Sequence, residues 1–555
     1  MKPILILGGY GGFGRRLSRR LADKGYPLFI AGRSQAKAVA FCAELGCGTP
    51  LFANRDHPLD DILKAAQPVI LIDAAGPFQT SDYRVAEACI RCGVHYLDLA
   101  DGRDFVCGIG RLDKDAKLNG VVVRSGVSSV PALSGAVLRE LVAPMTRVSR
   151  IDMAISASSR ATLGASVAKA ILSYAGQKLS LWRGQAWTNG FGWQELSRTT
   201  FEVAGRRPLS RLVALAEVPD HEIWPAILTG KPAVTFKAGT ESAFQMLGLW
   251  LLSWMVRWKW FASLVGLGPI LLPVQRLTSW LGNNRSAMKI EVLGFEGELP
   301  VRARWTLLAE RGDGPEIPTM AAACLADLIQ AGLVASGAQD SSQELALDQF
   351  QAQFSKLAIS EEQTKVPDLP LYQKVMGRNF DDLPSSVRAV HSTEGDGAAV
   401  GNAQVACGDN PVNAFLCFMF GFPPSGQHDL RVHFCRDGAS VLWVRHFGEH
   451  RMKSRLCQSD QKLVEQFGPL RFYFHLQPQD QGLAMILKRW TMLGLALPVV
   501  LAPRVDAREW DEAGQFQLSV SISLPLIGLI VAYRGQLAPV ETSVHLKSTP
   551  LPTQF

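Results

Sequence analysis

Short apolar runs alternate with helical patterns over the first 130 residues of the chain. Residues 4–7, 28–31 and 69–72 are continuous apolar runs that are long enough only for buried strands. Strands without polar alternation are typical of parallel sheets whose two faces are both covered by helices. Between the first two runs, Phe13 and Leu17 have helical spacing, and Gly25 ends the helical pattern. Residues 1–131 are therefore predicted to form an α/β domain with a doubly wound parallel sheet.

A glycine-rich turn joins the first predicted strand to the first predicted helix. Gly9, Gly11 and Gly14 have the G-x-G-x-x-G spacing of a Rossmann dinucleotide site. We expect Gly9 to permit the tight turn, Gly11 to let the backbone approach a pyrophosphate, and Gly14 to allow close packing of helix and strand. The free N–H groups of the helix N-terminus favour an anion there. The predicted phosphate-binding residues are Gly8, Gly9, Tyr10, Gly11, Gly12, Phe13 and Gly14.

The end of the second predicted strand indicates which dinucleotide is bound. An acidic residue usually stands there in NAD sites and holds the ribose 2′-hydroxyl, whereas arginine accommodates a 2′-phosphate. This strand ends in Arg33 and Ser34, with no acid nearby. A guanidinium suits a phosphate, and the serine adds a donor. We therefore expect NADP (NADPH) as the cofactor.

Three later loops follow strand patterns at residues 74–78, 98–102 and 125–131. Ligands of doubly wound sheets bind beyond the carboxyl ends of the strands, so these loops are expected to border the site. We expect Ala75, Gly76, Pro77 and Phe78 to pass near the nicotinamide ribose. The candidate catalytic residues are the polar side chains of Tyr96, Asp98, Asp101 and Ser129, and the sequence assigns no specific role to any of them.

These loops also carry a resemblance to a known family. The glycine loop, A-G-P-F at 75–78, V-H-Y-L-D-L-A-D-G at 94–102 and S-G-V-S-S-V-P at 125–131 together resemble the saccharopine dehydrogenase-like family. That family includes saccharopine reductases and the trans-acting enoyl reductases of lipid biosynthesis. The resemblance covers about residues 1–335. It implies a Rossmann domain over 1–131, an inserted α+β substrate domain over 132–317, and a helix over 318–335 that returns to the first domain.

The second predicted domain contains a hairpin pattern and an unusual apolar stretch. Two alternating runs flank a turn at 294–297, which predicts the hairpin. Residues 244–274 are strongly apolar and rich in tryptophan. Arg257 and Lys259 lie in the middle of this stretch, and each would cost roughly 2.5 to 3.5 kcal/mol at the centre of a bilayer. A spanning helix is therefore not expected. We expect one of two arrangements. In one, the stretch serves as the core and lid of an apolar substrate pocket, and in the other it lies at a membrane interface with its cations at the headgroups.

The remaining chain divides into a polar segment and a segment of short strands. Residues 336–368 are acidic and rich in Gln and Ser, and we expect a linker. Residues 369–545 show short alternating runs between Gly and Pro, which predict a separate β-rich domain. G-R-N-F at 377–380, W-V-R-H-F at 443–447 and L-P-L-I-G at 524–528 resemble an uncharacterised domain family found fused to such dehydrogenase-like modules. No chemistry comes with that resemblance.

One motif in the C-terminal region has the spacing of a zinc site. Residues 446–450 read H-F-G-E-H, which fits H-x-x-E-H. That motif requires a helix, whereas the preceding residues have a strand pattern and Gly448 suits a turn. We predict the tip of a hairpin there and no metal site.

Composition and charge narrow the partners. The 555 residues carry a formal net charge of +7, and no block of lysine and arginine predicts nucleic-acid binding. Ten scattered cysteines in a long chain indicate a reducing compartment. The first apolar run is too short for a signal peptide. We expect a cytoplasmic protein, with peripheral attachment to the inner face of the membrane through 244–274 as the alternative.

These features lead to one functional prediction. The protein is expected to be an NADP-dependent oxidoreductase that transfers a hydride to or from a hydrophobic C=O, C=N or C=C substrate. Because no Ser-Tyr-Lys set is recognisable, two alternatives stay open: a catalytically inactive NADP-binding scaffold, and a protein that binds and presents lipid. The predicted partner is a small, lipid-like molecule, and a homodimer is left open.

Overall fold

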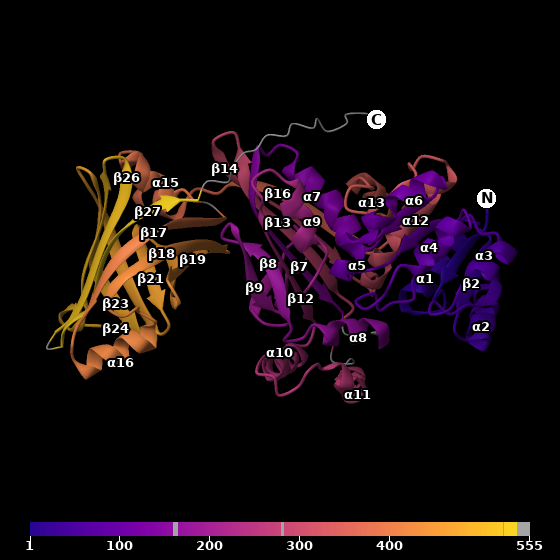
Figure 1. The fold of residues 1–555 in the computed structure, drawn as a ribbon, viewed down its shortest axis with the longest axis horizontal. Coiled ribbons are helices and arrows are strands. Elements are labelled where there is room, and N and C mark those ends of the chain that lie inside the picture. The colour runs from indigo at the N-terminus through magenta and orange to yellow at the C-terminus, as the bar shows by residue number, and fades with distance from the viewer. Residues whose placement is uncertain (159–164, 279–281, 394, 526, 541–555) are drawn as a thin grey trace.

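The computed structural model describes residues 1–158, 165–278, 282–393, 395–525 and 527–540. Three large sheets follow one another along its longest axis (Figure 1). The first two sheets share one continuous hydrophobic core, whereas the third encloses a core of its own. The predicted fold class is confirmed: an N-terminal parallel sheet with helices, a mixed α+β part, and a separate β-rich C-terminal domain.

The first sheet is parallel and has the strand order β15-β6-β5-β4-β1-β2-β3. The order reverses at β1, so the loops after β1 and β4 diverge and open a crevice at the carboxyl ends of the strands. Its strands from the N-terminal part are β1 (Ile4–Leu7), β2 (Leu28–Gly32), β3 (Thr49–Phe52), β4 (Ile70–Asp73), β5 (His95–Asp98) and β6 (Val122–Ser125). Its helices are α1 (Gly12–Asp23), α2 (Gln35–Leu45), α3 (Asp60–Ala66), α4 (Arg84–Arg91), α5 (Arg103–Cys107) and α6 (Asp113–Leu118).

The second sheet is mixed and has the order β10-β11-β12-β7-β13-β14-β16. The hairpin expected around residues 294–297 is confirmed, because β13 and β14 pair from Ser286–Ala309 to Glu296–Leu299. The strands of this sheet that come before residue 317 in the chain are β7 (Arg147–Ala157), β10 (Ser197–Phe201), β11 (Leu209–Leu215), β12 (Ala233–Thr240), β13 (Ser286–Glu296) and β14 (Leu299–Ala309). The other elements of this region are α7 (Ser134–Val142), α8 (Ala165–Ser173), β8 (Lys178–Arg183), β9 (Ala186–Phe191), α9 (Asp220–Ile227), α10 (Ala243–Arg257) and α11 (Gly268–Thr278).

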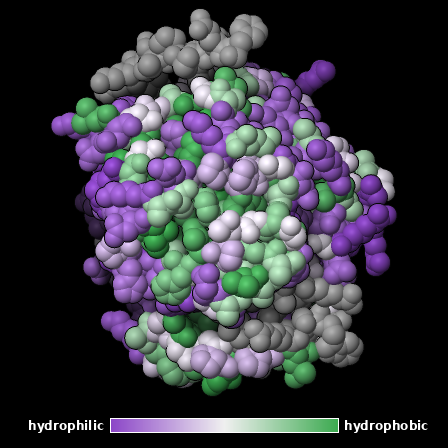
Figure 2. Space-filling model, turned by 90° about the vertical axis from the view of Figure 1, so that its right-hand side faces the viewer, coloured by the Kyte–Doolittle hydropathy of each residue, from purple (hydrophilic) through white to green (hydrophobic). Residues whose placement is uncertain are grey.

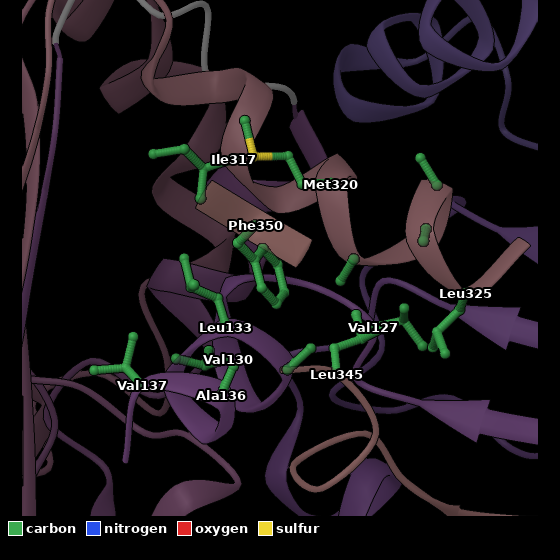
Figure 3. Close-up of a cluster of buried hydrophobic side chains, with 14 of the residues drawn as sticks. Val127, Val130, Leu133, Ala136, Val137, Ile317, Met320, Leu325, Leu345 and Phe350 are labelled. Carbon is green, nitrogen blue, oxygen red and sulfur yellow. The ribbon is translucent and has the colours of Figure 1, made fainter. Parts of the chain in front are cut away.

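A late helix ties the first two parts together. Helix α12 (Ile317–Gln330) packs beside α1, where the Tyr26 hydroxyl donates to Asp327 at 2.6 Å and Arg20 pairs with Glu316 at 3.1 Å. Figure 3 shows Met320 of α12 above Leu133, which ends the helical turn η2 (Ser129–Leu133). The returning element therefore closes a core that residues 1–158 alone would leave open.

The linker predicted over 336–368 is wrong. These residues form β15 (Gly337–Asp340), α13 (Leu347–Phe354) and β16 (Ile359–Pro367), which add an edge strand to the first and to the second sheet. Edge strands pair through backbone groups and expose their side chains, so a polar sequence is compatible with them. Helix α13 is anchored by Leu347, Phe350 and Phe354, an apolar set at helical spacing that polar neighbours obscure.

The C-terminal domain is an antiparallel sheet that closes on itself, because β22 (Leu470–Gln479) pairs with β23 (Gly482–Met492) as well as with β21. The H-x-x-E-H segment is confirmed as a hairpin tip, since Phe447 of β19 pairs with His450 of β20. The other strands are β17 (Asp396–Cys407), β18 (Gly426–Asp437), β19 (Ser440–Phe447), β20 (His450–Ser459), β21 (Lys462–Phe467), β24 (Leu495–Leu497), β25 (Arg504–Glu512), β26 (Gln515–Leu524) and β27 (Gly528–Pro539). The helices are α14 (Leu371–Met376), α15 (Ser385–His391) and α16 (Pro411–Phe420).

The apolar stretch 244–274 forms α10 and the start of α11, and it is buried on one side only. Met246, Ser253 and Val256 of α10 are buried, whereas Phe244 and Leu251 are 73% and 58% exposed. None of the described helices is both long and apolar enough to span a bilayer. All ten cysteines are free thiols.

Candidate cofactor and active site

The glycine loop after β1 has a conformation that only small residues permit. Gly8 has a φ of +79°, a left-handed value that favours glycine. A Cβ on Gly14 would lie 2.1 Å from the Gly8 carbonyl oxygen, so α1 can begin this close to the loop only without a side chain. The tight turn that we predicted at Gly9 therefore depends on the left-handed conformation of Gly8. Gly9 is instead confined by Ile6 and Ile30, because a Cβ there would lie 3.0 Å from the Ile6 carbonyl oxygen and 3.2 Å from the Ile30 side chain.

The N-terminus of α1 is free to hold an anion. Gly11 precedes the helix without a side-chain cap, and the first turn contains no acidic residue. A Cβ on Gly12 would meet nothing within 4 Å, so the space in front of the helix is open. Ser18 donates to the Gly9 carbonyl at 3.1 Å and thereby holds the loop against the helix. Unpaired backbone N–H groups at the positive end of a helix bind phosphate.

Tyr10 organises the end of β2. Its ring lies on Gly32, where any Cβ would come within 2.6 Å of the ring, and its hydroxyl accepts from the Ser34 N–H at 2.9 Å. The Ser34 hydroxyl accepts from the Lys37 N–H at 3.4 Å and caps α2. Arg33 is exposed and forms no ion pair with any residue that the structure describes. Its guanidinium is therefore available for a phosphate beyond β2.

The loop 74–78 is held by an arginine that sequence reasoning missed. Arg55, which follows β3, donates to the Ala75 carbonyl at 2.9 Å and lies 4.8 Å from the centre of the Phe78 ring. It also pairs at 3.3 Å with Asp73, the fully buried last residue of β4. Burial raises the pKa of the Asp73 carboxyl, and the Arg55 guanidinium opposes that rise. A basic residue just beyond the third strand is the one signal in the sequence that indicates this role.

Asp98 ends β5 and joins two loops at the floor of the crevice. Its Oδ1 accepts from the Ala100 N–H at 3.0 Å, the Ser125 hydroxyl at 3.0 Å and the Gly126 N–H at 2.8 Å. Burial raises the pKa of this carboxyl to about 7, although the three donors oppose the rise. Asp98 is fully buried, so it holds the loops in place and is not exposed to a substrate.

The other three candidate catalytic residues have different surroundings. Tyr96 is 1% exposed within the core on one side of the first sheet, so the structure does not bring it to the crevice. Ser129 is buried at the start of η2. Asp101 lies at the surface of the crevice, where the Gln79 side chain donates to it at 2.9 Å. Of the four, Asp101 alone is exposed.

The crevice is closed on its far side by the second domain. Arg103, at the start of α5, pairs with Glu222 of α9 at 3.0 Å and donates to the Ser180 carbonyl of β8 at 2.7 Å. Tyr174, which follows α8, stacks on Trp193 with ring centres 5.9 Å apart. Sequence reasoning missed both residues, because their partners lie far away in the chain.

Tyr174 joins the polar crevice to an apolar wall. Burial raises the pKa of its hydroxyl, and the carboxylates of Asp101 and Glu217 raise it further. The same side chain packs against a buried cluster formed by α8, α10 and their neighbours. The buried members of this cluster are Leu172, Ala175, Trp193, Ala214, Met246, Val256 and Leu264. Tyr174 therefore lies between this buried apolar cluster and Asp101, which follows β5 at the carboxyl ends of the first sheet.

A second polar cluster joins the C-terminal domain to the second sheet. Asp396, His433 and Cys435 offer ligand atoms that lie within 4.8 Å of one another, the one such group among the described residues. Arg150 of β7 points into it, with Nη1 3.2 Å from the Cys435 sulfur and 3.5 Å from Asp396. Since the guanidinium already supplies the positive charge, we interpret the cluster as an ion-paired contact between domains.

The observed geometry fits a dinucleotide with a 2′-phosphate. The open N-terminus of α1 faces the expected position of the pyrophosphate, and Arg33 is exposed beyond β2. The loop 74–78, held by Arg55, borders the expected position of the nicotinamide ribose. Seen from this end of the molecule, hydrophilic residues surround a central zone of hydrophobic ones (Figure 2). The nicotinamide would lie toward Tyr174 and the second domain.

Comparison with known proteins identifies two parts of the chain. No curated protein matches the sequence. A saccharopine dehydrogenase (L-Glu forming) from Saccharomyces cerevisiae is similar over 66% of this chain and 100% of its own, at 11% identity and a TM-score of 0.45. An amine dehydrogenase from Mycobacterium smegmatis is similar over 62% and 96%, at 12% identity and a TM-score of 0.33. Residues 4–122 match the family described as "Saccharopine dehydrogenase NADP binding domain", and residues 383–537 match "Domain of unknown function (DUF4166)". The match over residues 4–122 indicates binding of NADP(H), and the match over residues 383–537 is to a separate domain family.

Proposed function

We propose that the protein is an NADP-dependent oxidoreductase that acts on a hydrophobic C=O, C=N or C=C substrate. The observation that carries this proposal is the position of Tyr174. It stands between the crevice of the NADP-binding domain and the apolar cluster of α8 and α10. A substrate with an apolar body would pack on that cluster and present its reacting group to the crevice.

The cofactor, when bound, supplies or accepts the hydride, and the protein supplies orientation, a dry site and a proton. Gly11 and the N-terminus of α1 would hold the pyrophosphate, and Arg33 the 2′-phosphate. Arg103 keeps the second domain against the crevice and limits the access of water.

Tyr174 is the proposed proton donor. The phenol is protonated at neutral pH, and because burial and two nearby carboxylates raise its pKa, it gives up its proton only to a strongly basic atom. It can therefore donate to an oxygen, nitrogen or carbon that gains negative charge as the hydride arrives, and it would recover the proton from solvent through Asp101. A positioned general acid contributes roughly 100-fold to 10,000-fold in rate.

The test is a search for turnover followed by one substitution. NADPH consumption would be measured with long-chain aldehydes, ketones, imines and enones. For any substrate found, Tyr174→Phe should lower kcat about 100-fold while NADPH affinity stays within about twofold. Tyr26→Phe is the control, because it removes a hydroxyl that bonds to Asp327 away from the crevice. Tight NADPH binding with no turnover across the panel would overturn the proposal and favour the inactive scaffold.

A further inference from the structure

The closed sheet of the C-terminal domain encloses a large apolar cavity. Its volume is about 330 Å³, within the range of pockets that bind small molecules. Side chains of almost every strand of the domain line it, and most are Leu, Val, Ile, Met or Phe, such as Leu430, Val432, Phe474 and Val520. An apolar lining of this size, in an otherwise well packed protein, suits an apolar ligand.

The floor of the cavity, next to α14 and α15, is lined by polar side chains, and the charged ones among them pair with one another. Arg445 pairs with Glu465 at 3.1 Å, and Glu509 contacts His391 of α15. The Tyr372 hydroxyl is buried without a hydrogen-bond partner among the described residues. Burial raises the pKa of this phenol, so it remains a donor. Because a further charge would find no counter-charge here, a ligand end that reaches the floor must be uncharged.

The opposite end of the cavity reaches the surface beside α16. Met419 lines the cavity and is also 54% exposed. Asn413 holds α16 on the sheet by donating to the Leu529 carbonyl at 2.6 Å, while Phe418 on its outer side is 85% exposed. The adjacent connection from β23 to β25 exposes Leu493 and Val500, at 80% and 82%. The opening is therefore surrounded by apolar side chains that face solvent.

Two segments beside this opening contain no acidic residue, although Asp409 and Asp506 directly flank them. Residues 481–505 contain Lys488, Arg489 and Arg504, all exposed, and no acidic residue. Residues 410–425, which include α16, carry no charged residue at all. Exposed apolar side chains beside cations are the combination that binds anionic lipid surfaces, where each basic residue near the surface contributes about 1 kcal/mol.

We propose that the C-terminal domain is a lipid-binding domain. It would dock on an anionic bilayer with the apolar rim formed by α16 and residues 492–501, and it would take one long-chain lipid with an uncharged head into the closed sheet. The lipid would enter beside Met419, its chain lying on the apolar lining and its uncharged end near Tyr372. This inference does not rest on the redox activity proposed above.

The first test measures occupancy of the cavity. The full-length protein would be incubated with vesicles of phosphatidylcholine and phosphatidylglycerol that contain hexadecanol, and then separated from them by gel filtration. Mass spectrometry should find about one hexadecanol per chain. Val520→Trp, which fills the cavity from β26, should lower this at least tenfold. Val400→Trp places the same side chain on an exposed position of β17 and should leave it unchanged.

Thermal unfolding followed by circular dichroism on the same samples reports whether the C-terminal domain of each variant is folded, because this domain has a hydrophobic core of its own. Equal hexadecanol content in wild type and Val520→Trp, or none in the wild type, would overturn the proposal. Neither result would bear on the oxidoreductase function, because no step of this test requires hydride transfer.

The second test separates the rim from the cavity. Phe418→Asp with Leu493→Asp should reduce flotation with the anionic vesicles at least fivefold and slow the uptake of hexadecanol from them at least tenfold. Uptake of hexadecanol added in ethanol should stay within about twofold, because the cavity is unchanged. The control, Leu118→Asp with Leu333→Asp, alters residues of similar exposure on the NADP-binding side of the molecule. Equal flotation of the two double variants would exclude the rim as the docking surface.

Discussion

At the scale of single residues, two glycines of the phosphate loop have different tasks. Gly14 is required by the fold, because any Cβ there would overlap the Gly8 carbonyl. A Cβ on Gly11 would meet only the Gly8 carbonyl oxygen, at 3.0 Å, and would otherwise face the space in front of α1. The first glycine therefore sets the loop, and the second keeps room for a ligand.

We predict that Gly11→Val abolishes NADPH binding with little change in thermal stability, because the branched side chain would occupy the pyrophosphate position. Gly14→Val should lower stability as well. Isothermal calorimetry and thermal unfolding of both variants provide the comparison. Unchanged NADPH affinity in Gly11→Val would show that this loop does not hold the pyrophosphate.

Arg33 determines the cofactor preference in our interpretation. It is exposed and free of ion pairs with the described residues, so a 2′-phosphate would be its partner. We expect NADPH to bind at least about tenfold more tightly than NADH, which is a difference of about 1.4 kcal/mol. Arg33→Asp should erase or reverse the preference, because a negative charge then faces the phosphate. Equal affinities of the wild type for the two nucleotides would contradict this assignment.

Asp98 should make the stability of the NADP-binding domain depend on pH. Its folded pKa of about 7 lies above its ordinary value, so the folded protein retains a proton that the unfolded chain releases. The contribution of the Asp98 carboxyl to the free energy of unfolding is therefore largest at low pH. It falls by up to about 1.4 kcal/mol per pH unit as the pH rises toward 7.

Asp98→Asn keeps an acceptor for its three donors but cannot ionise. The difference in free energy of unfolding between the variant and the wild type should shift in favour of the variant from pH 5 to pH 8. Urea unfolding at these two pH values measures it. Asp115→Asn, at an exposed position of α6, should show no such gain. A constant difference between Asp98→Asn and the wild type would mean that Asp98 stays ionised.

At the scale of elements, the loop after β4 depends on a side chain from another loop. Arg55→Ala would leave Asp73 buried without its counter-charge and release the Ala75 carbonyl. We expect NADPH affinity to fall about tenfold, or about 1.4 kcal/mol, with the glycine loop intact.

Arg55→Lys should be intermediate, because lysine keeps the charge but lacks the planar group that lies near Phe78. Arg111→Ala is the matched control, since it removes an arginine stacked 3.8 Å from the Tyr83 ring, outside this loop. If both alanine variants bind NADPH as the wild type does, Arg55 has no part in positioning the loop.

At the scale of the whole molecule, two apolar surfaces lie along one edge. Helices α10, α11 and α16 all lie at the lower edge of Figure 1, although they belong to different domains. On the α10 side, Trp258 and Trp260 are 59% and 67% exposed. Arg257 is not free for headgroups, because it donates to Gln194 at 2.6 Å and lies 4.0 Å from the Phe191 ring. Lys259 is also exposed, and it is the cation of this segment that we expect to reach headgroups.

We propose that the α10 side also contacts anionic lipid. Trp258→Ala with Trp260→Ala should reduce the fraction bound to anionic vesicles at least fivefold, and high salt should weaken wild-type binding. Phe52→Ala, at an equally exposed aromatic residue of β3, should have no effect. Because both surfaces would bind one bilayer, combining these changes with those in the α16 rim should cost more than either alone. Salt-independent binding would contradict the electrostatic part of this proposal.

Elements with local sequence signals could be predicted before the structure was known. A continuous apolar run specifies a buried strand wherever it occurs, and the glycine spacing specifies the turn that follows β1. For this reason the parallel sheet, the NADP-binding domain and the hairpin of β13 and β14 were predictable from residues 1–131 and 286–309. The β-rich character of the C-terminal domain followed in the same way from short alternating runs.

Features that depend on partners distant in the chain became evident in the folded protein. The strands β15 and β16 are polar, and they form because neighbouring edges offer unpaired backbone groups. Arg55 and Tyr174 have no motif, and their roles arise where separate loops or domains meet. The cavity exists because β22 pairs with β23 and closes the sheet, a long-range pairing that no local pattern specifies. Side-chain periodicity is encoded over a few residues, whereas enclosure is a property of the whole fold.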